Sequence, residues 1–226
     1  YPHNAQFGSA ASVLDGASLY SRAFEIMLDI DDKRVKQILA TTTNVIAEGE
    51  VMQIMNVHDA EPTEAKYLEV IHCKTAKLFE AATQLGAVLC DRSEAEIEAM
   101  AKYGRYLGTA FQLIDDVMDY SSSSEDMGKN VGDDLAEGKP TLPLIYAIQQ
   151  GDTDQIALIK SAIESGGYDK IDEVQAIIQQ TSALSYTENM AQQQAQLAID
   201  ALSILPDSEY KTILENIARL SVHRSH

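Results

Sequence analysis

The chain has 226 residues, of which 45% are hydrophobic, and a formal net charge of −18 at pH 7. This length and composition predict one globular domain with a large core and exclude general disorder. The negative charge argues against nucleic acid or an anionic membrane surface as the main partner, because both would repel an acidic protein. No apolar run reaches the roughly 18 residues of a membrane span and no secretory signal is present, so we expect a cytoplasmic protein.

The first part of the chain predicts long helices, because apolar residues recur every three or four positions over 8–29 and 33–57. The expected core stripe of the second helix consists of Val35, Ile38, Leu39, Val45, Ile46, Val51, Ile54 and Met55. A third helix is predicted from Thr63 to Leu89. Cys73 falls in this helix and Cys90 at its end, on the order of 25 Å apart, which is too far for a disulfide. We expect both to be buried thiols in a reducing compartment.

The rest of the chain is also helical by pattern. Ser93 and Glu96 form a capping box for a helix that runs to the aspartates near residue 115. Lys139 to Gln150 predicts a helix entered through Pro140. Further helices are predicted at about 154–165, 169–181, 184–204 and 207–222. No strand, internal repeat or linker is evident, so residues 1–226 are expected to form one all-α helical bundle.

Three carboxylates interrupt the apolar pattern near the end of one helix. Asp115 and Asp119 are one helical turn apart, Asp116 lies beside them, and Gln112 precedes them by one turn. Like charges this close repel each other unless cations lie between them. Oxygen ligands without Cys or His suit Mg²⁺, which commonly bridges carboxylates to substrate phosphates. A bare DDxxD is also compatible with a solvated acidic helix end, so the residues downstream decide between the two.

The downstream segment is GKNVGDDLAEGKPTLP, from Gly128 to Pro143. Its two lysines, Lys129 and Lys139, can supply cations to phosphate oxygens that a metal does not neutralise. Together, GxxFQxxDDxxD and GKxxGDDLxEGKxTLP resemble the second aspartate-rich region of trans-prenyl diphosphate synthases. Within that family the chain is most similar to bacterial octaprenyl-type members, from about residue 4 to the C-terminus.

This resemblance implies a fold and a reaction. The fold is an isoprenoid-synthase-type bundle of long antiparallel helices around a central cavity. The reaction condenses an allylic prenyl diphosphate with isopentenyl diphosphate, with Mg²⁺ as cofactor. The product is a long-chain all-trans polyprenyl diphosphate, a precursor of quinone side chains such as that of ubiquinone. Family members pair through the apolar helices before residue 90, so a homodimer is expected.

The resemblance also implies roles for single residues. Lys74 matches the lysine of a KT motif that binds the allylic diphosphate, and Thr75 matches the threonine that faces the developing carbocation. Lys129, Lys139 and the C-terminal Arg224 are further expected substrate ligands. The other matches are Gln112 near the diphosphate, Asp115, Asp116 and Asp119 as metal ligands, and Glu48-Gly49-Glu50 with Gln53 as the GExxQ signature. Lys77 has no counterpart and is expected at the surface.

The chain departs from the family pattern in two places. Asp15-Gly16-Ala17-Ser18 stands where the family has Gly-Asp followed by an aromatic residue. In the family, a first DDxxD and an Arg-Arg pair precede the stretch that begins here at Tyr1, and the 226 residues contain neither. The domain is therefore expected to be N-terminally incomplete. An alternative reading is a non-catalytic or inactive truncated form that retains the fold and dimerisation only.

Overall fold

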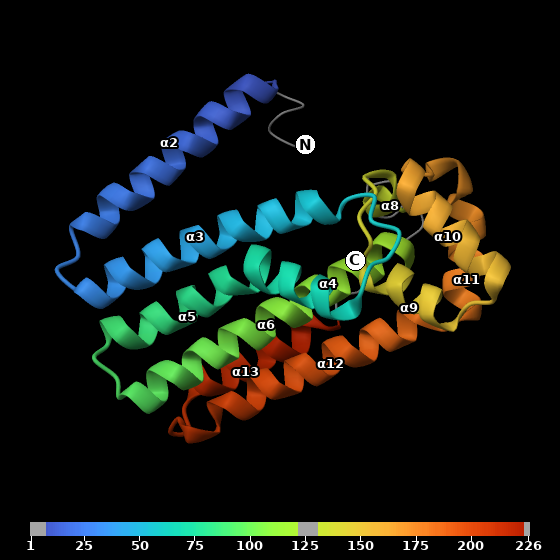
Figure 1. Ribbon diagram of the computed structural model, residues 1–226. Coiled ribbons are helices and arrows are strands. Elements are labelled where there is room, and N and C mark those ends of the chain that lie inside the picture. The colour runs from blue at the N-terminus through green and yellow to red at the C-terminus, as the bar shows by residue number, and fades with distance from the viewer. Residues whose placement is uncertain (1–7, 122–130, 224–226) are drawn as a thin grey trace. The chain divides into compact units, whose positions relative to one another are not determined.

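The computed structural model describes residues 8–121 and 131–223. Lys129 and Arg224, two of the expected substrate ligands, lie outside these residues. Every regular element in the described part is helical (Figure 1), which confirms the all-α prediction. The helices are α2 (Ser9–Leu28), α3 (Lys33–Asn56), α4 (Glu64–Ile71), a π-helical turn η1 (His72–Ala76), α5 (Lys77–Leu89), α6 (Glu94–Ser121), α8 (Asp133–Ala136), α9 (Leu142–Gln150), α10 (Thr153–Ser165), η2 (Tyr168–Lys170), α11 (Ile171–Gln180), α12 (Ala183–Ala201), η3 (Leu202–Ile204) and α13 (Glu209–Ser221).

The chain divides into two compact units, Tyr1–Thr41 and Thr42–His226. The first unit contains α2 and the first residues of α3. Its α2 leaves large apolar side chains such as Val13, Leu14 and Leu19 exposed. The second unit contains the rest of the helices and every residue discussed below as part of the site. The prediction of a single domain over 1–226 stays a prediction.

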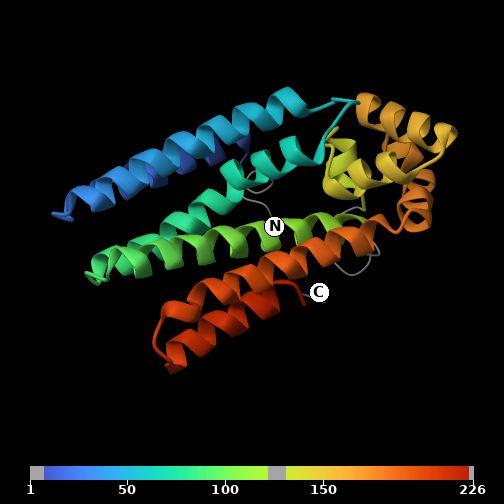
Figure 2. The same cartoon turned by 60° about the horizontal axis from the view of Figure 1, so that its bottom comes forward.

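Helix α6 is the axis of the second unit. It packs most extensively against α12 and α5, and Figures 1 and 2 show these helices running side by side. Two glycines allow the close approach of α5 and η1: a Cβ on Gly104 would lie 2.4 Å from the carbonyl oxygen of Phe79 in α5, and one on Gly108 would lie 2.7 Å from the Cα of Ala76 in η1. Because backbone atoms occupy these places, α5 and α6 could not approach this closely with larger residues there.

The short helices α8 to α11 gather at one end of the unit, at the C-terminal end of α6 (Figure 1). A buried cluster holds them together, formed by Tyr120, Leu135, Leu144, Ala147, Ile159, Ala162, Ile163, Val174, Ile177, Ile178 and Ala183. Leu135 and Leu144 are completely buried in this cluster. The segment between α8 and α9 is therefore fixed beside the aspartates of α6.

Most helix boundaries match the sequence predictions. The Ser93–Glu96 capping box opens α6, since the Ser93 amide donates to Glu96 Oε2 at 3.0 Å and the Glu96 amide donates to Ser93 Oγ at 3.4 Å. The exception is α9, which begins at Leu142 rather than Lys139. Residues before it are held in a turn, because the Lys139 amide donates to the Asp134 carbonyl. Pro143 then occupies the first turn, where its missing N–H has no helical acceptor.

Several predictions of burial were wrong. Val51, Ile54 and Met55, expected in the core stripe of α3, are 56%, 71% and 75% exposed. Cys90 is exposed because it ends α5, although it and the partly buried Cys73 are free thiols as expected.

Lys77, expected at the surface, is instead largely covered. Its ammonium lies 2.5 Å from Glu80 Oε1, and only 19% of its side chain is exposed.

Among the described residues, no helix has both the length and the apolar character needed to cross a membrane.

Candidate active site

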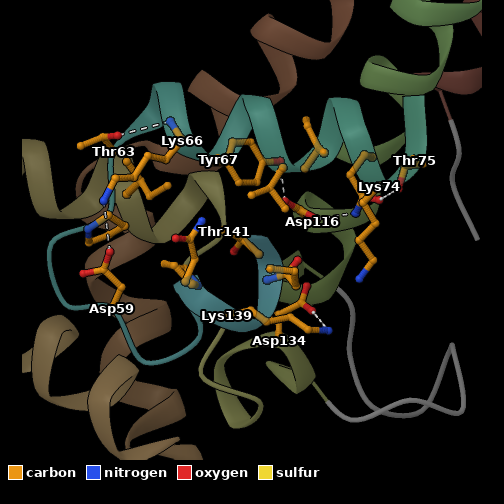
Figure 3. A pocket seen from close by; sticks show the side chains of 18 of the residues that line it. Asp59, Thr63, Lys66, Tyr67, Lys74, Thr75, Asp116, Asp134, Lys139 and Thr141 are labelled. Atoms are coloured by element: carbon orange, nitrogen blue, oxygen red, sulfur yellow. Dashed lines mark hydrogen bonds and ion pairs between the residues drawn. The ribbon is translucent and has the colours of Figure 1, made fainter. Parts of the chain in front are cut away.

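The best-formed cavity in the described part of the second unit lies where the end of α3, α4, η1, α6 and the segment before α9 meet (Figure 3). Six of the site residues expected from the sequence line it: Lys74, Thr75, Gln112, Asp115, Asp116 and Lys139. Residues that the sequence analysis did not single out line it as well, notably Tyr67, Lys66 and Asp134. The structure thus brings together residues separated by more than 60 positions in the chain.

Lys74 and Thr75 lie in the π-helical turn η1, which interrupts what the sequence predicted as one continuous helix. A glycine from each neighbouring helix makes room for this wider turn. A Cβ on Gly49 of α3 would lie 2.7 Å from the Lys74 amide nitrogen, and a Cβ on Gly108 would lie 2.7 Å from the Ala76 Cα. Such turns are common at functional sites because they redirect side chains. Here the Lys74 ammonium lies at the cavity, 3.6 Å from Glu50 Oε1.

Asp115 and Asp116 are neighbours in sequence but differ in their surroundings. Asp115 is exposed at the cavity and forms no hydrogen bond or ion pair with other described residues. Asp116 is 2% exposed, and both of its oxygens are occupied: the Tyr67 hydroxyl donates to Oδ2 at 2.5 Å and the Gln112 amide donates to Oδ1 at 2.9 Å. Adjacent residues point about 100° apart around a helix, which explains the difference.

Asp119 anchors the segment that follows α6. Its Oδ2 accepts a hydrogen bond from the Asp134 amide at 3.2 Å, and its carbonyl accepts one from the Gly132 amide at 2.9 Å. It does not line the cavity itself. Asp134 does, and the Lys139 ammonium lies 3.3 Å from Asp134 Oδ1. Asp134 is the last residue of the GDD in the downstream motif, which the sequence analysis did not connect with a role for this aspartate.

Buried acidic side chains lie close together in and beside the cavity wall. Burial raises the pKa of Asp116 to about 8, with the nearby charge of Asp134 adding to the effect. Burial and then Asp134 likewise raise the pKa of Asp119 to about 7, and burial raises the pKa of Asp134. These shifts mean that the protein alone does not compensate the acids fully. Added positive charge beside them is therefore favourable.

A hard divalent cation fits this donor set through Asp115. In the described ranges, no group of three or more His, Cys, Asp or Glu side chains is arranged to hold an ion by itself. Asp115 and Asp134 line the same cavity, however, and both offer carboxylate oxygens. Mg²⁺ typically binds one or two carboxylates and completes its shell with waters and substrate phosphates. The predicted ligand set of Asp115, Asp116 and Asp119 stays a prediction.

Comparison with known proteins decides the family. The polyprenyl synthetase family model matches residues 2–181. The chain belongs to the polyprenyl synthetase family. An octaprenyl diphosphate synthase from Haemophilus influenzae is 54% identical over 224 residues, which are 99% of this chain and 68% of the relative. The octaprenyl diphosphate synthase of Escherichia coli is 46% identical over 98% of this chain and 69% of its own length.

Solved structures agree with this assignment. A polyprenyl synthase from Caulobacter crescentus, complexed with calcium and isoprenyl diphosphate, matches with a TM-score of 0.92 and 40% identity. The match covers 98% of this chain and 68% of that one. A decaprenyl diphosphate synthase from Rhodobacter capsulatus matches with a TM-score of 0.90 and 37% identity, over 97% of this chain and 68% of its own. The predicted family and its isoprenoid-synthase fold are therefore confirmed, and nothing in these comparisons favours the alternative of a non-catalytic form.

Proposed function

We propose that this polyprenyl synthetase condenses an allylic prenyl diphosphate with isopentenyl diphosphate and makes a long-chain, octaprenyl-type product. The proposal rests on the composition of the cavity lining. Lys74 and Lys139 provide cations there, beside the acids Asp115 and Asp134. A diphosphate matches this mixture, because its oxygens can pair with the lysines directly and with the acids through a bridging cation. The octaprenyl products named for the two bacterial relatives support the product class.

The reaction depends on stabilising the charge that develops when diphosphate leaves. Lys74 from η1 and Lys139 from the segment before α9 line the cavity from different elements, and both would hold diphosphate oxygens there. When bound, Mg²⁺ would act as a Lewis acid toward the leaving diphosphate. Donors preorganised for such charge typically supply the largest part of catalysis. Thr75 and Gln112 line the same cavity and would face the allylic cation as it forms. The isopentenyl double bond then attacks that cation, and loss of a proton gives the longer product.

Calorimetric titration with geranyl diphosphate tests the site. Binding should require Mg²⁺ and disappear with excess chelator. Asp115→Ala should abolish the Mg²⁺-dependent binding of geranyl diphosphate. Lys74→Ala should weaken this binding. Each substitution removes a charge from the cavity. Lys77→Ala is the matched control, since Lys77 pairs with Glu80 and does not line the cavity. Tight binding of geranyl diphosphate without a divalent cation would refute the proposed site.

Product length needs a separate measurement. The full-length protein should extend radiolabelled geranyl or farnesyl diphosphate to octaprenyl diphosphate, identified by chromatography after dephosphorylation. Products of fifteen or twenty carbons only would contradict the long-chain assignment. We further propose that the product serves quinone side-chain synthesis, as the resemblance implies, and that the protein is cytoplasmic.

A homodimer is supported by exposed apolar surface on α2 and α3. Val13, Leu14 and Leu19 are 71%, 70% and 73% exposed, and Ile54 and Met55 of α3 are similarly uncovered. Exposed apolar patches of this kind mark interaction surfaces in soluble proteins. Light scattering at micromolar concentration should give twice the chain mass, and Leu19→Glu should reduce it to the monomer mass. A monomeric wild-type protein would contradict the proposal.

A further inference from the structure

A continuous chain of side-chain hydrogen bonds crosses the cavity wall, from α4 through α6 to η1. The Tyr67 hydroxyl donates to Asp116 Oδ2 at 2.5 Å, and the Gln112 amide nitrogen donates to Asp116 Oδ1 at 2.9 Å. The Thr75 hydroxyl donates to the Gln112 amide oxygen at 3.2 Å. Tyr67 and Asp116 are 7% and 2% exposed, so neither exchanges these partners with bulk water. Figure 3 shows Tyr67, Asp116 and Thr75 converging along one side of the cavity.

The direction of this chain is set at Asp116. Its two oxygens face two donors, Tyr67 and Gln112. A carboxylate accepts at both oxygens, so with Tyr67 donating to Oδ2, Gln112 turns its NH₂ group toward Oδ1. The reversed amide would place two acceptor oxygens against each other. The Gln112 carbonyl oxygen therefore faces Thr75.

The consequence appears at Thr75. A threonine hydroxyl has one hydrogen to donate, and here that hydrogen is committed to Gln112. The lone pairs of Thr75 Oγ1 remain available to the cavity that Thr75 lines. Lone pairs are the negative end of the hydroxyl dipole, so this orientation favours a cation in front of the threonine. If the direction of the hydrogen-bond chain were reversed, the Thr75 hydroxyl hydrogen would point into the cavity and would repel the same cation.

We propose that Tyr67 and Asp116 are positioning residues that fix the direction of this hydrogen-bond chain, and that Asp116 does not bind a metal ion directly. The inference rests on the proposed function, because it is the allylic cation of that reaction that the Thr75 oxygen would stabilise. It divides the neighbouring acids by role. Asp115, exposed and without a described partner, serves the metal, whereas Asp116 has both oxygens occupied inside the protein.

The first test separates metal binding from positioning. Mg²⁺-dependent binding of geranyl diphosphate is measured by calorimetry for the full-length protein and for Asp115→Asn, Asp116→Asn and Tyr67→Phe. Asp115→Asn should lose the Mg²⁺-dependent binding. Asp116→Asn and Tyr67→Phe should bind within about threefold of wild type, because they change no group that contacts the ligand or the ion. If Asp116→Asn loses as much affinity as Asp115→Asn, the inference is wrong.

The second test measures how the direction of the hydrogen-bond chain affects kcat and KM. In the condensation assay, Tyr67→Phe and Asp116→Asn should lower kcat roughly tenfold or more while the KM for geranyl diphosphate stays nearly constant, because only the cationic transition state is affected. Tyr103→Phe is the matched control. Its hydroxyl donates to the Leu214 carbonyl at 2.8 Å, and neither residue lines the cavity. It should reduce stability without reducing kcat.

A double-mutant cycle distinguishes action through Thr75 from a structural role. Thr75→Val removes the hydroxyl with little change in shape. In that background, Asp116→Asn should cost little additional kcat, since the group through which it acts is gone. Losses in kcat that multiply in the double variant would overturn the inference. Absence of Mg²⁺-dependent binding in the wild-type protein is a different result and would refute the proposed function itself.

Discussion

Gly108 on α6 is where one added methyl group most directly tests how the cavity is built. A Cβ there would lie 2.7 Å from the Ala76 Cα and 3.1 Å from the Phe79 Cβ, whereas ordinary contact begins at 3.4 Å. The nearest obstacle is backbone, so the π-helical turn or α6 must move by several tenths of an ångström. Gly86 on α5 offers a matched control, because a Cβ added there meets nothing within 4 Å.

The two substitutions should have opposite effects on stability. Replacing a helical glycine by alanine stabilises a helix by about 0.5–1 kcal/mol, so Gly86→Ala should raise the free energy of unfolding by that amount. In Gly108→Ala the same gain is opposed by overpacking, which costs about 1–3 kcal/mol. For a chain of this size, 1 kcal/mol corresponds to about 2–4 °C in Tm. Gly108→Ala should therefore lower Tm by several degrees.

The two variants should also differ in binding. Displacing Ala76 displaces the turn that carries Lys74 and Thr75, so Gly108→Ala should weaken Mg²⁺-dependent binding of geranyl diphosphate. Gly86→Ala should leave the affinity unchanged. Differential scanning calorimetry gives the stability and isothermal titration gives the affinity. If Gly108→Ala matched Gly86→Ala in both measurements, the close packing of η1 on α6 would not be what positions Lys74.

Two further predictions concern stability elsewhere. Leu113 is 0% exposed in the apolar cluster that includes Tyr67 and Ile71. Leu113→Ala should therefore lower the free energy of unfolding by about 2–5 kcal/mol in urea titration, and a loss below 1 kcal/mol would contradict this packing. Hydrogen bonds from Arg92 and Ser93 lower the pKa of Glu96 to about 2. Its carboxylate thus stabilises the fold above about pH 4.5 and ceases to do so as the pH falls toward 2. Glu96→Gln should have a lower Tm than wild type at pH 7, and a difference that did not shrink between pH 5 and pH 3 would argue against this contribution.

The capping and apolar-spacing patterns predicted the helices well, because interactions between residues close in sequence determine where a helix begins and ends. The Ser93–Glu96 capping box and the apolar spacing that follows it located α6 to within a residue or two. Periodicity shows that a helix has an apolar face, but it does not tell whether that face meets the core or a partner. Ile54 and Met55 were placed in the core for this reason, and both are exposed.

The π-helical turn could not be predicted from local sequence. His72 to Ala76 contains no glycine or proline, and nothing in its spacing departs from an ordinary helix. The turn has its place between Gly49 and Gly108, which lie 23 or more positions away along the chain. The family resemblance did predict that Lys74 and Thr75 belong to the site, and both line the cavity. Neither motif nor periodicity could indicate that both Asp116 oxygens are occupied, because Tyr67 comes from a different helix.

His58, a residue with no motif signal, contacts the residue that precedes Lys139. His58 has φ 63°, its amide donates to the Gly138 carbonyl at 2.8 Å, and its Nδ1 lies 2.9 Å from the Ile163 carbonyl oxygen. A carbonyl only accepts, so Nδ1 carries the hydrogen. Histidine tolerates this left-handed conformation better than most residues, and β-branched residues tolerate it worst.

This geometry predicts a ranked series of variants. His58→Gly keeps the backbone conformation and loses only the imidazole contact, which should cost about 1 kcal/mol in the free energy of unfolding. His58→Val adds the strain of a β-branched residue at positive φ, about 1–3 kcal/mol more. Because His58 holds Gly138, the residue before Lys139, both should weaken geranyl diphosphate binding in the same order. Urea titration and calorimetry measure the two quantities. A valine variant as stable as the glycine variant would show that the left-handed turn at His58 is not what holds the Lys139 segment in place.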